Sequence, residues 1–196
     1  MMRIPQNAGL LIIDVQKGMD DPKWGPRNNP DAEEKIAALL AEWRKTRRPV
    51  FHVQHLSTEP DSPLRPERPG CEIKELVRPA GQEPVFQKRV NSAFIGTQLE
   101  DVLHRQGVET LVITGLTTQH CVSTTARMAG NLGFEVYLVG DAMAAFAAMG
   151  PDGKRYSAEE IHNVSLATLH GEFGIVVDAK AVISCLTAQD THGEAS

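Results

Sequence analysis

The sequence predicts an α/β fold, with a doubly wound, mostly parallel sheet of about six strands and helices on both faces in a three-layer sandwich. Two observations predict it. Short apolar, β-branched runs alternate along the chain with segments of helical periodicity, which is the pattern of βαβ units. The first of these runs, residues 9–15 (GLLIIDV), is continuously apolar as far as Asp14. Such a run is typical of a strand that is buried on both faces of a parallel sheet.

Local signals then predict each element in order. Residues 16–30 contain several glycines and prolines and predict a loop. Asn29 and Pro30 predict a helix start, with Asn29 as the N-cap and the proline in the first turn. Apolar residues then recur at helical spacing until Pro49 ends the helix. Residues 50–55 (VFHVQH) are expected to form the second strand.

A long connection follows the second strand. Residues 57–84 contain six prolines and many charged residues. A connection of this length without secondary structure is uncommon inside a compact domain and is usually functional or disordered. We expect an ordered excursion that covers a site or a subunit contact.

The remaining segments continue the alternation of strand and helix, as in a Rossmann-like sheet with right-handed crossovers. We expect strands at 85–88, 109–114, 134–139 and 174–177, and helices at 97–105, around Cys121, at about 157–169 and ending near Leu186. Neither a repeat nor a linker divides the chain. The sequence therefore predicts a single domain over residues 1–196, with residues 187–196 as a frayed polar tail.

Composition restricts the classes of partner and compartment. The chain has 196 residues, 41% of them apolar, and a net charge of -5, which argues against nucleic acid or an anionic membrane as partner. The first residues lead directly into a predicted strand rather than a signal peptide, and no apolar run reaches membrane-spanning length. Three separated cysteines without a CxxC pair argue against a zinc knuckle or dithiol site. We expect a reduced, cytoplasmic protein.

Residues 109–127 present a cysteine in the way that α/β proteins present a nucleophile. A β-branched strand ends at Gly115, and Cys121 follows in the first turn of the next helix. A thiol there faces the positive end of the helix dipole and unpaired N–H groups, which favour the thiolate. From this stretch alone, an inert buried cysteine is an equally good interpretation.

Asp14 and Lys88 shift that balance, because each lies at the carboxyl end of a predicted strand, as Cys121 does. A doubly wound sheet brings these ends together at its switch point. A carboxylate beside a thiol can take its proton, and a lysine beside both stabilises the two anions. Cys121, Asp14 and Lys88 are thus the expected nucleophile, base and positive orienter. Singly, each has a structural alternative: a loop cap, a surface lysine and an inert thiol.

Four motifs in this order resemble the isochorismatase-like cysteine hydrolases: LLIIDVQ, QKRVNSAF, TGLTTQHCV and GFEVYLVGDAMAAF. This family includes nicotinamidases, N-carbamoylsarcosine amidohydrolase, and ureidoacrylate and biuret hydrolases. The resemblance covers nearly the whole chain. It implies a catalytic triad of Asp14, Lys88 and Cys121, and a cis peptide bond between Leu116 and Thr117. It also implies an oxyanion hole made by the N–H groups of Thr117 and Cys121.

Motif positions and the first loop supply candidates for a substrate pocket. Phe94 and Trp24 are expected as apolar walls, and Gln16, Gln119 and His120 as polar groups. Alternatives remain open for three of these residues. Trp24 can serve only to pack its loop, and Gln119 and His120 can be surface residues at a helix start.

The histidines of the second strand argue against a metal site. Nicotinamidases that bind a metal carry an Asp-x-His arrangement and a further histidine after that strand. Here the region reads HVQHLSTEPDSP, with His52 and His55 but no adjacent aspartate. Residues three apart in a strand point to opposite faces. We expect no metal and no other cofactor, and both histidines as strand-end or core residues.

Cys121 and the resemblance together imply a metal-independent hydrolase that cleaves the C–N bond of a small amide, ureido or carbamoyl substrate through a thioester. The alternatives are an isochorismatase-type ether hydrolase, which does not depend on a cysteine nucleophile, a non-catalytic ligand-binding protein and a thiol redox protein. A nucleotide role is disfavoured because GxGxxG is absent. The resemblance also implies a homodimer or homotetramer.

Overall fold

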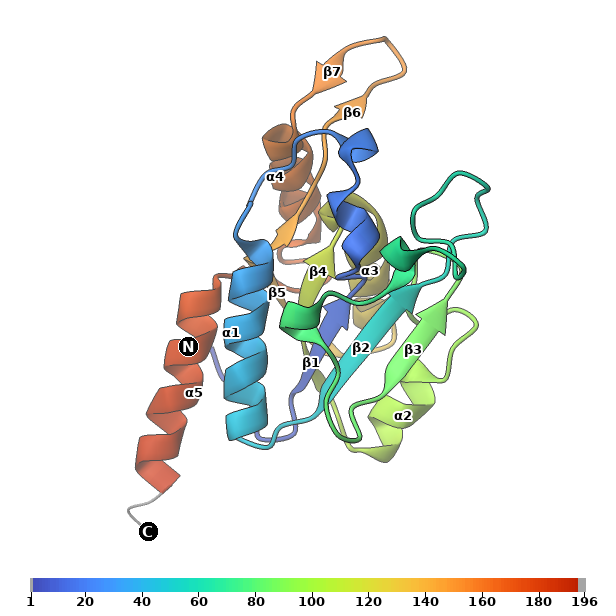
Figure 1. Ribbon diagram of the computed structural model, residues 1–196. Helices are drawn as coiled ribbons and strands as arrows, with labels where there is room; N and C mark the ends of the chain where they lie inside the picture. The colour runs from blue at the N-terminus through green and yellow to red at the C-terminus, as the bar shows by residue number, and fades with distance from the viewer. Residues whose placement is uncertain (1, 194–196) are drawn as a thin grey trace.

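Six parallel strands form one sheet in the order β3-β2-β1-β4-β5-β8 (Figure 1) in the computed structural model, which describes the backbone of residues 2–193 and the side chains of residues 2–188. The fold class predicted from the sequence is confirmed. The strands are β1 (Gly9–Ile13), β2 (Val50–His55), β3 (Val85–Lys88), β4 (Thr110–Leu116), β5 (Glu135–Ala144) and β8 (Ile175–Val177).

Helices cover both faces of the sheet. α1 (Ala32–Lys45) and α5 (Ala179–Gly193) pack together on one face, and α2 (Leu99–Arg105), α3 (Ser123–Asn131) and α4 (Ala158–Leu169) lie on the other (Figure 1). Alternate residues of β1 enter two different cores: Leu10 and Ile12 face α1, whereas Leu11 and Ile13 face the opposite helices. This explains why the run is continuously apolar.

The strand order places a switch point between β1 and β4. From β1 the chain proceeds outward through β2 to β3, and it then returns to β4 on the other side of β1. Connections leave β1 and β4 in opposite directions there, which opens a crevice at their carboxyl ends. The short helical turns η1 (Lys17–Asp20), η2 (Pro22–Trp24) and η5 (Thr118–Val122) lie at this edge.

The excursion of residues 57–84 is ordered and contains only the short turns η3 (Pro69–Cys71) and η4 (Glu75–Val77). Its first part, from Ser57 to Leu64, lines the main cavity, whereas Val77 packs into the core under α1. The first part of the excursion therefore covers this cavity, which agrees with one of the two alternatives expected from the sequence.

Three details differ from the sequence predictions. Asn29 does not cap α1, which begins at Ala32; its side-chain amide instead donates to the carbonyl groups of Gly140 (3.2 Å) and Met143 (2.8 Å). β5 continues to Ala144, beyond its expected end at residue 139, because its second half pairs again with β4 after a shift of register.

The third difference lies at the end of the chain. α5 continues to Gly193, through most of the tail that was expected to be frayed, and residues 194–196 lie outside the described residues.

An additional antiparallel pair, β6 (Ala148–Met149) and β7 (Arg155–Tyr156), projects from the body beside α4 (Figure 1). Among the described residues, none of the helices is long and apolar enough to cross a membrane.

Candidate active site

Asp14, Lys88 and Cys121 meet at the carboxyl edge of the sheet. Asp14 follows β1, Lys88 ends β3, and Cys121 lies in η5 after β4. The Lys88 ammonium donates to Asp14 Oδ2 at 2.6 Å and to Cys121 Sγ at 3.2 Å. It also lies 3.1 Å from Nδ1 of His55, the last residue of β2. The structure brings together the three residues that the strand-end argument selected, and adds a histidine.

Close approach of β4 to β1 brings these residues together. Gly115 has φ +125°, and a Cβ at this position would lie 2.1 Å from the carbonyl oxygen of Ile13. Any other residue would push the two strands apart, so glycine is required here. Asp14 itself adopts a left-handed backbone conformation (φ 52°), which is uncommon outside glycine. The chain thus turns sharply at the acid.

Burial dominates the electrostatics of the site. Asp14 and Lys88 are almost completely buried. Burial raises the pKa of Asp14, and the Lys88 ammonium offsets only part of this effect. Burial, together with the Asp14 carboxylate, raises the pKa of the Cys121 thiol to about 12. The resting nucleophile is therefore a thiol, contrary to the expectation that the helix start would favour the thiolate.

The segment before Cys121 has the backbone that the resemblance implied, because the peptide bond between Leu116 and Thr117 is cis. Thr117 and Cys121 both line the cavity. The Thr117 hydroxyl lies 3.3 Å from Nδ1 of His120, which also lines the cavity.

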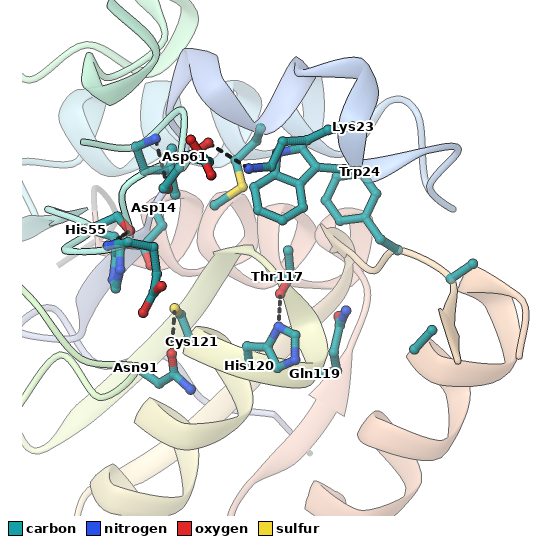
Figure 2. A pocket seen from close by; sticks show the side chains of 18 of the residues that line it. Asp14, Lys23, Trp24, His55, Asp61, Asn91, Thr117, Gln119, His120 and Cys121 are labelled. Atoms are coloured by element: carbon teal, nitrogen blue, oxygen red, sulfur yellow. Dashed lines mark hydrogen bonds between the residues drawn. The ribbon is translucent and has the colours of Figure 1, made fainter. Parts of the chain in front are cut away.

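A cavity of about 610 Å³ opens above the triad. Figure 2 shows Asp14, His55 and Cys121 close together on one side of it. Trp24 forms part of another wall, where its ring stacks on Phe146 at 6.0 Å between centroids. The Lys23 ammonium at the rim donates to the Asp61 carbonyl at 3.0 Å. A cavity of this volume and mixed lining suits a small molecule.

The expected pocket residues fall into two groups. Trp24, Gln119 and His120 line the cavity, whereas Gln16 and Phe94 do not belong to its lining. Phe94 is 7% exposed and packs on Phe134 in the core, since its ring faces the helices rather than the crevice. Phe94 therefore lies in the core and outside the lining of the cavity.

Gln16 also has another role than substrate binding. Its amide donates to the carbonyl oxygens of His55 (3.0 Å) and Cys71 (2.8 Å), and its oxygen accepts from the His55 N–H at 2.9 Å. The side chain is completely buried. Gln16 therefore joins the ends of β1 and β2 and lies outside the lining of the cavity.

Sequence reasoning gave no role in the site to His55, Asn91 or Phe146, which are among the residues that line the cavity. Asn91 Oδ1 lies 3.8 Å from Cys121 Sγ (Figure 2). Asn91 and Phe146 stand inside the quoted motifs QKRVNSAF and GFEVYLVGDAMAAF, so the motifs themselves carried the signal. The sequence identified His55 as a strand-end residue. It did not show that His55 lies beside Lys88, because that contact depends on the register between the two strands.

A metal does not fit among these groups. Ligand atoms of Asp14, His55 and Cys121 lie within 4.8 Å of one another, as in many metal sites. However, the Lys88 ammonium already lies within 3.2 Å of an atom of each of them. A metal ion would have to displace this buried cation or lie against it, and like charges repel.

Comparison with known proteins gives a consistent result. The family model for the isochorismatase domain matches residues 8–181. The chain is 49% identical to the uncharacterized isochorismatase family protein YrdC of Bacillus subtilis, over 91% of this chain and 96% of that protein. It resembles the structure of a putative hydrolase of the isochorismatase family from Chromobacterium violaceum, with a TM-score of 0.92, 44% identity, and coverage of 95% and 97% of the two chains.

Two further relatives have names that state an activity. Streptothricin hydrolase of Streptomyces noursei is 34% identical over 70% of this chain and 54% of its own length. Nicotinamidase 3 of Arabidopsis thaliana is 28% identical over 87% of this chain and 84% of its own length.

Proposed function

The chain belongs to the isochorismatase family, and from this membership we propose that it is a metal-independent cysteine hydrolase that cleaves a C–N bond of a small amide or ureide. One observation carries the proposal. A single buried ammonium, that of Lys88, bridges a carboxylate and a thiol at the base of a cavity. Base, nucleophile and orienting cation are the parts that covalent catalysis requires.

The first half of the reaction forms a thioester. The Asp14 carboxylate takes the proton of the Cys121 thiol, and Sγ attacks the carbonyl carbon of the substrate. The raised pKa of Asp14 helps, because it makes the carboxylate a stronger base towards a thiol whose pKa is about 12. Asp14 then gives this proton to the leaving nitrogen as the C–N bond breaks. Ammonia or an amine departs, and the acyl group remains on sulfur.

Water completes the cycle. Asp14 takes a proton from the water, whose oxygen attacks the thioester carbon. Asp14 then gives this proton to sulfur as the C–S bond breaks, which releases the acid and restores the thiol. In both halves the N–H groups of Thr117 and Cys121 are proposed to bind the negative oxygen. One such preorganised donor contributes about 3–4 kcal/mol to lowering the barrier.

The cavity and two relatives support this substrate class. The Trp24–Phe146 wall suits a flat or apolar acyl group, and the volume of the cavity suits a small molecule. The relatives are a nicotinamidase, whose name denotes an amide substrate, and a streptothricin hydrolase. The proposal extends to a cytoplasmic location and to a homodimer or homotetramer. Light scattering would test the oligomeric state.

A panel of small amides and ureides tests the proposal. We expect release of ammonia or amine from at least one member, and loss of this release in Cys121→Ala. A cooperative thermal unfolding transition would show that the variant is folded, so that its loss of activity reflects the missing thiol. Full turnover in Cys121→Ala would refute the mechanism, and hydrolysis of vinyl ethers but no amide would favour an ether hydrolase.

A further inference from the structure

His55 is a titratable side chain in direct contact with Lys88, and the proposed mechanism does not use it. It ends β2, and its Cα is paired in register with that of Lys88 at the end of β3. Paired residues of neighbouring parallel strands direct their side chains to the same face of the sheet. The imidazole and the ammonium are therefore neighbours by strand register, which gives the 3.1 Å approach of Nδ1 to Nζ.

Hydrogen bonding fixes which ring nitrogen carries the proton. An ammonium only donates, so Nδ1 of His55 must be the unprotonated acceptor of the Lys88 bond. The backbone of Val90 also hydrogen bonds the ring and favours its protonated form, as a carbonyl acceptor does. The remaining nitrogen, Nε2, is left to carry the hydrogen for this bond. Burial and the Lys88 charge lower the pKa of the ring, which keeps it neutral.

The Lys88 ammonium then has a partner for each of its hydrogens. Its three N–H groups face three acceptors: Asp14 Oδ2, Cys121 Sγ and His55 Nδ1. Lys88 is 1% exposed, so water cannot easily replace a missing acceptor. Without the imidazole, one buried N–H would lack a partner, and the ammonium would rotate or move to find one.

The fold also holds the backbone of His55. The buried amide of Gln16 accepts from the His55 N–H and donates to the His55 carbonyl, so that one side chain bonds both groups. Two hydrogen bonds on one residue restrict the position of its Cα, and hence of its ring.

We propose that His55 is a positioning residue, a neutral imidazole that fixes the Lys88 ammonium so that its other two N–H groups stay on Asp14 and Cys121. The inference rests on the proposed function for its role in turnover. The positioning itself is a property of the free protein, so it can be measured without a substrate.

Alkylation of Cys121 by iodoacetamide, followed against pH by peptide mass spectrometry, reports how well the ammonium stabilises the thiolate. In His55→Leu we expect at least a fivefold slower reaction at pH 8, and a slower reaction at every pH of the profile. His55→Asn, whose side-chain oxygen stands near the position of Nδ1, should stay within about twofold of the unmodified protein. His52→Leu is the matched control, since His52 faces Glu83 instead, and it should leave the profile unchanged.

Two outcomes would overturn the proposal: an unchanged profile in His55→Leu, or equal impairment in the leucine and asparagine variants. A measurement on the unmodified protein covers the case of a variant that does not fold. Nitrogen-15 NMR of the His55 ring at pH 7 should show the Nε2–H tautomer, and an Nδ1–H or doubly protonated ring would contradict the proposal.

Turnover separates this inference from the proposed function. If the panel yields a substrate, His55→Leu should lower kcat at least tenfold with little change in KM, and His55→Asn should restore most of it. If no amide is hydrolysed, the proposed function fails, whereas alkylation and NMR still decide the role of His55.

Discussion

Two centres in this protein contain the same three kinds of group, a carboxylate, a cation and a histidine of β2, and differ in how completely the carboxylate is bonded. Glu83 accepts from Arg44 Nε (2.7 Å) and Nη2 (2.8 Å), from the Ala80 N–H (3.0 Å), and pairs with His52 Nε2 (2.8 Å). Asp14 accepts from Lys88 through Oδ2, and its Oδ1 has no hydrogen-bond partner among the described residues.

The two carboxyl groups respond in opposite directions. Burial raises the pKa of Glu83, but Arg44, Ala80 and His52 outweigh it and lower the value to about 2. Burial raises the pKa of Asp14, and Lys88 does not outweigh it. A fully bonded carboxylate is a fixed anion that stabilises the fold, whereas an incompletely bonded one retains affinity for a proton. Only the second kind can act as a base.

The largest expected effect comes from removing the base. Asp14→Asn keeps the shape of the side chain but cannot take the thiol proton, so turnover should fall by about 10³–10⁴. Steady-state assays on the best amide of the panel measure it. Glu83→Gln is the matched control and should retain turnover per folded molecule. A loss of less than tenfold in Asp14→Asn would show that Asp14 is not the base.

We expect the acid limb of the plot of kcat/KM against pH to reflect protonation of Asp14. Its pKa is raised above the ordinary 3.8, so kcat/KM should decline as the pH falls through that raised value, tenfold for each further unit. A rate that stays constant down to pH 4 in folded protein would contradict the assignment. Circular dichroism at each pH verifies folding.

Glu83→Gln should affect stability rather than rate. The variant loses charge-assisted bonds to Arg44 and His52, and we expect the free energy of unfolding to decrease by about 1–3 kcal/mol in urea titrations at pH 7.

The pH dependence of that loss provides a further check. The folded pKa of Glu83 is below its ordinary 4.5, so its stabilisation is present above pH 4.5 and disappears as the pH falls towards 2. The difference in stability between the two proteins should therefore vanish in acid. An equal difference at pH 3 and pH 7 would mean that the charge of Glu83 is not its cause.

The smallest effect is expected where neither centre is touched. Phe146→Leu removes the stacking partner of Trp24 on the cavity wall, and KM should rise about three- to tenfold with kcat nearly unchanged. A large fall in kcat would instead connect the wall to the chemistry.

The sequence predicted the strand ends better than the directions of side chains beside them. Periodicity and topology suffice for Asp14, Lys88 and Cys121, because the carboxyl ends of parallel strands must meet. The alternation rule also separated His52 from His55 correctly: one pairs with Glu83 and the other with Lys88.

What escaped prediction depends on contacts between distant segments. The side chain of Gln16, two residues after the left-handed Asp14, bonds the end of β2 instead of lining the cavity, and no local pattern signals this direction. The raised pKa of Cys121 likewise depends on burial by several segments, which outweighs the helix start that the sequence does show.

Gln16 has a consequence for how this protein can diverge in evolution. Its strongest bonds go to main-chain groups of His55 and Cys71, which every residue type except proline supplies in full. Gln16 therefore constrains the path of two neighbouring segments without constraining which amino acids occupy them. Positions 16 and 71 should show no pairwise covariation among related sequences, even though they are in contact, and loops around the cavity can change composition while their anchor is kept.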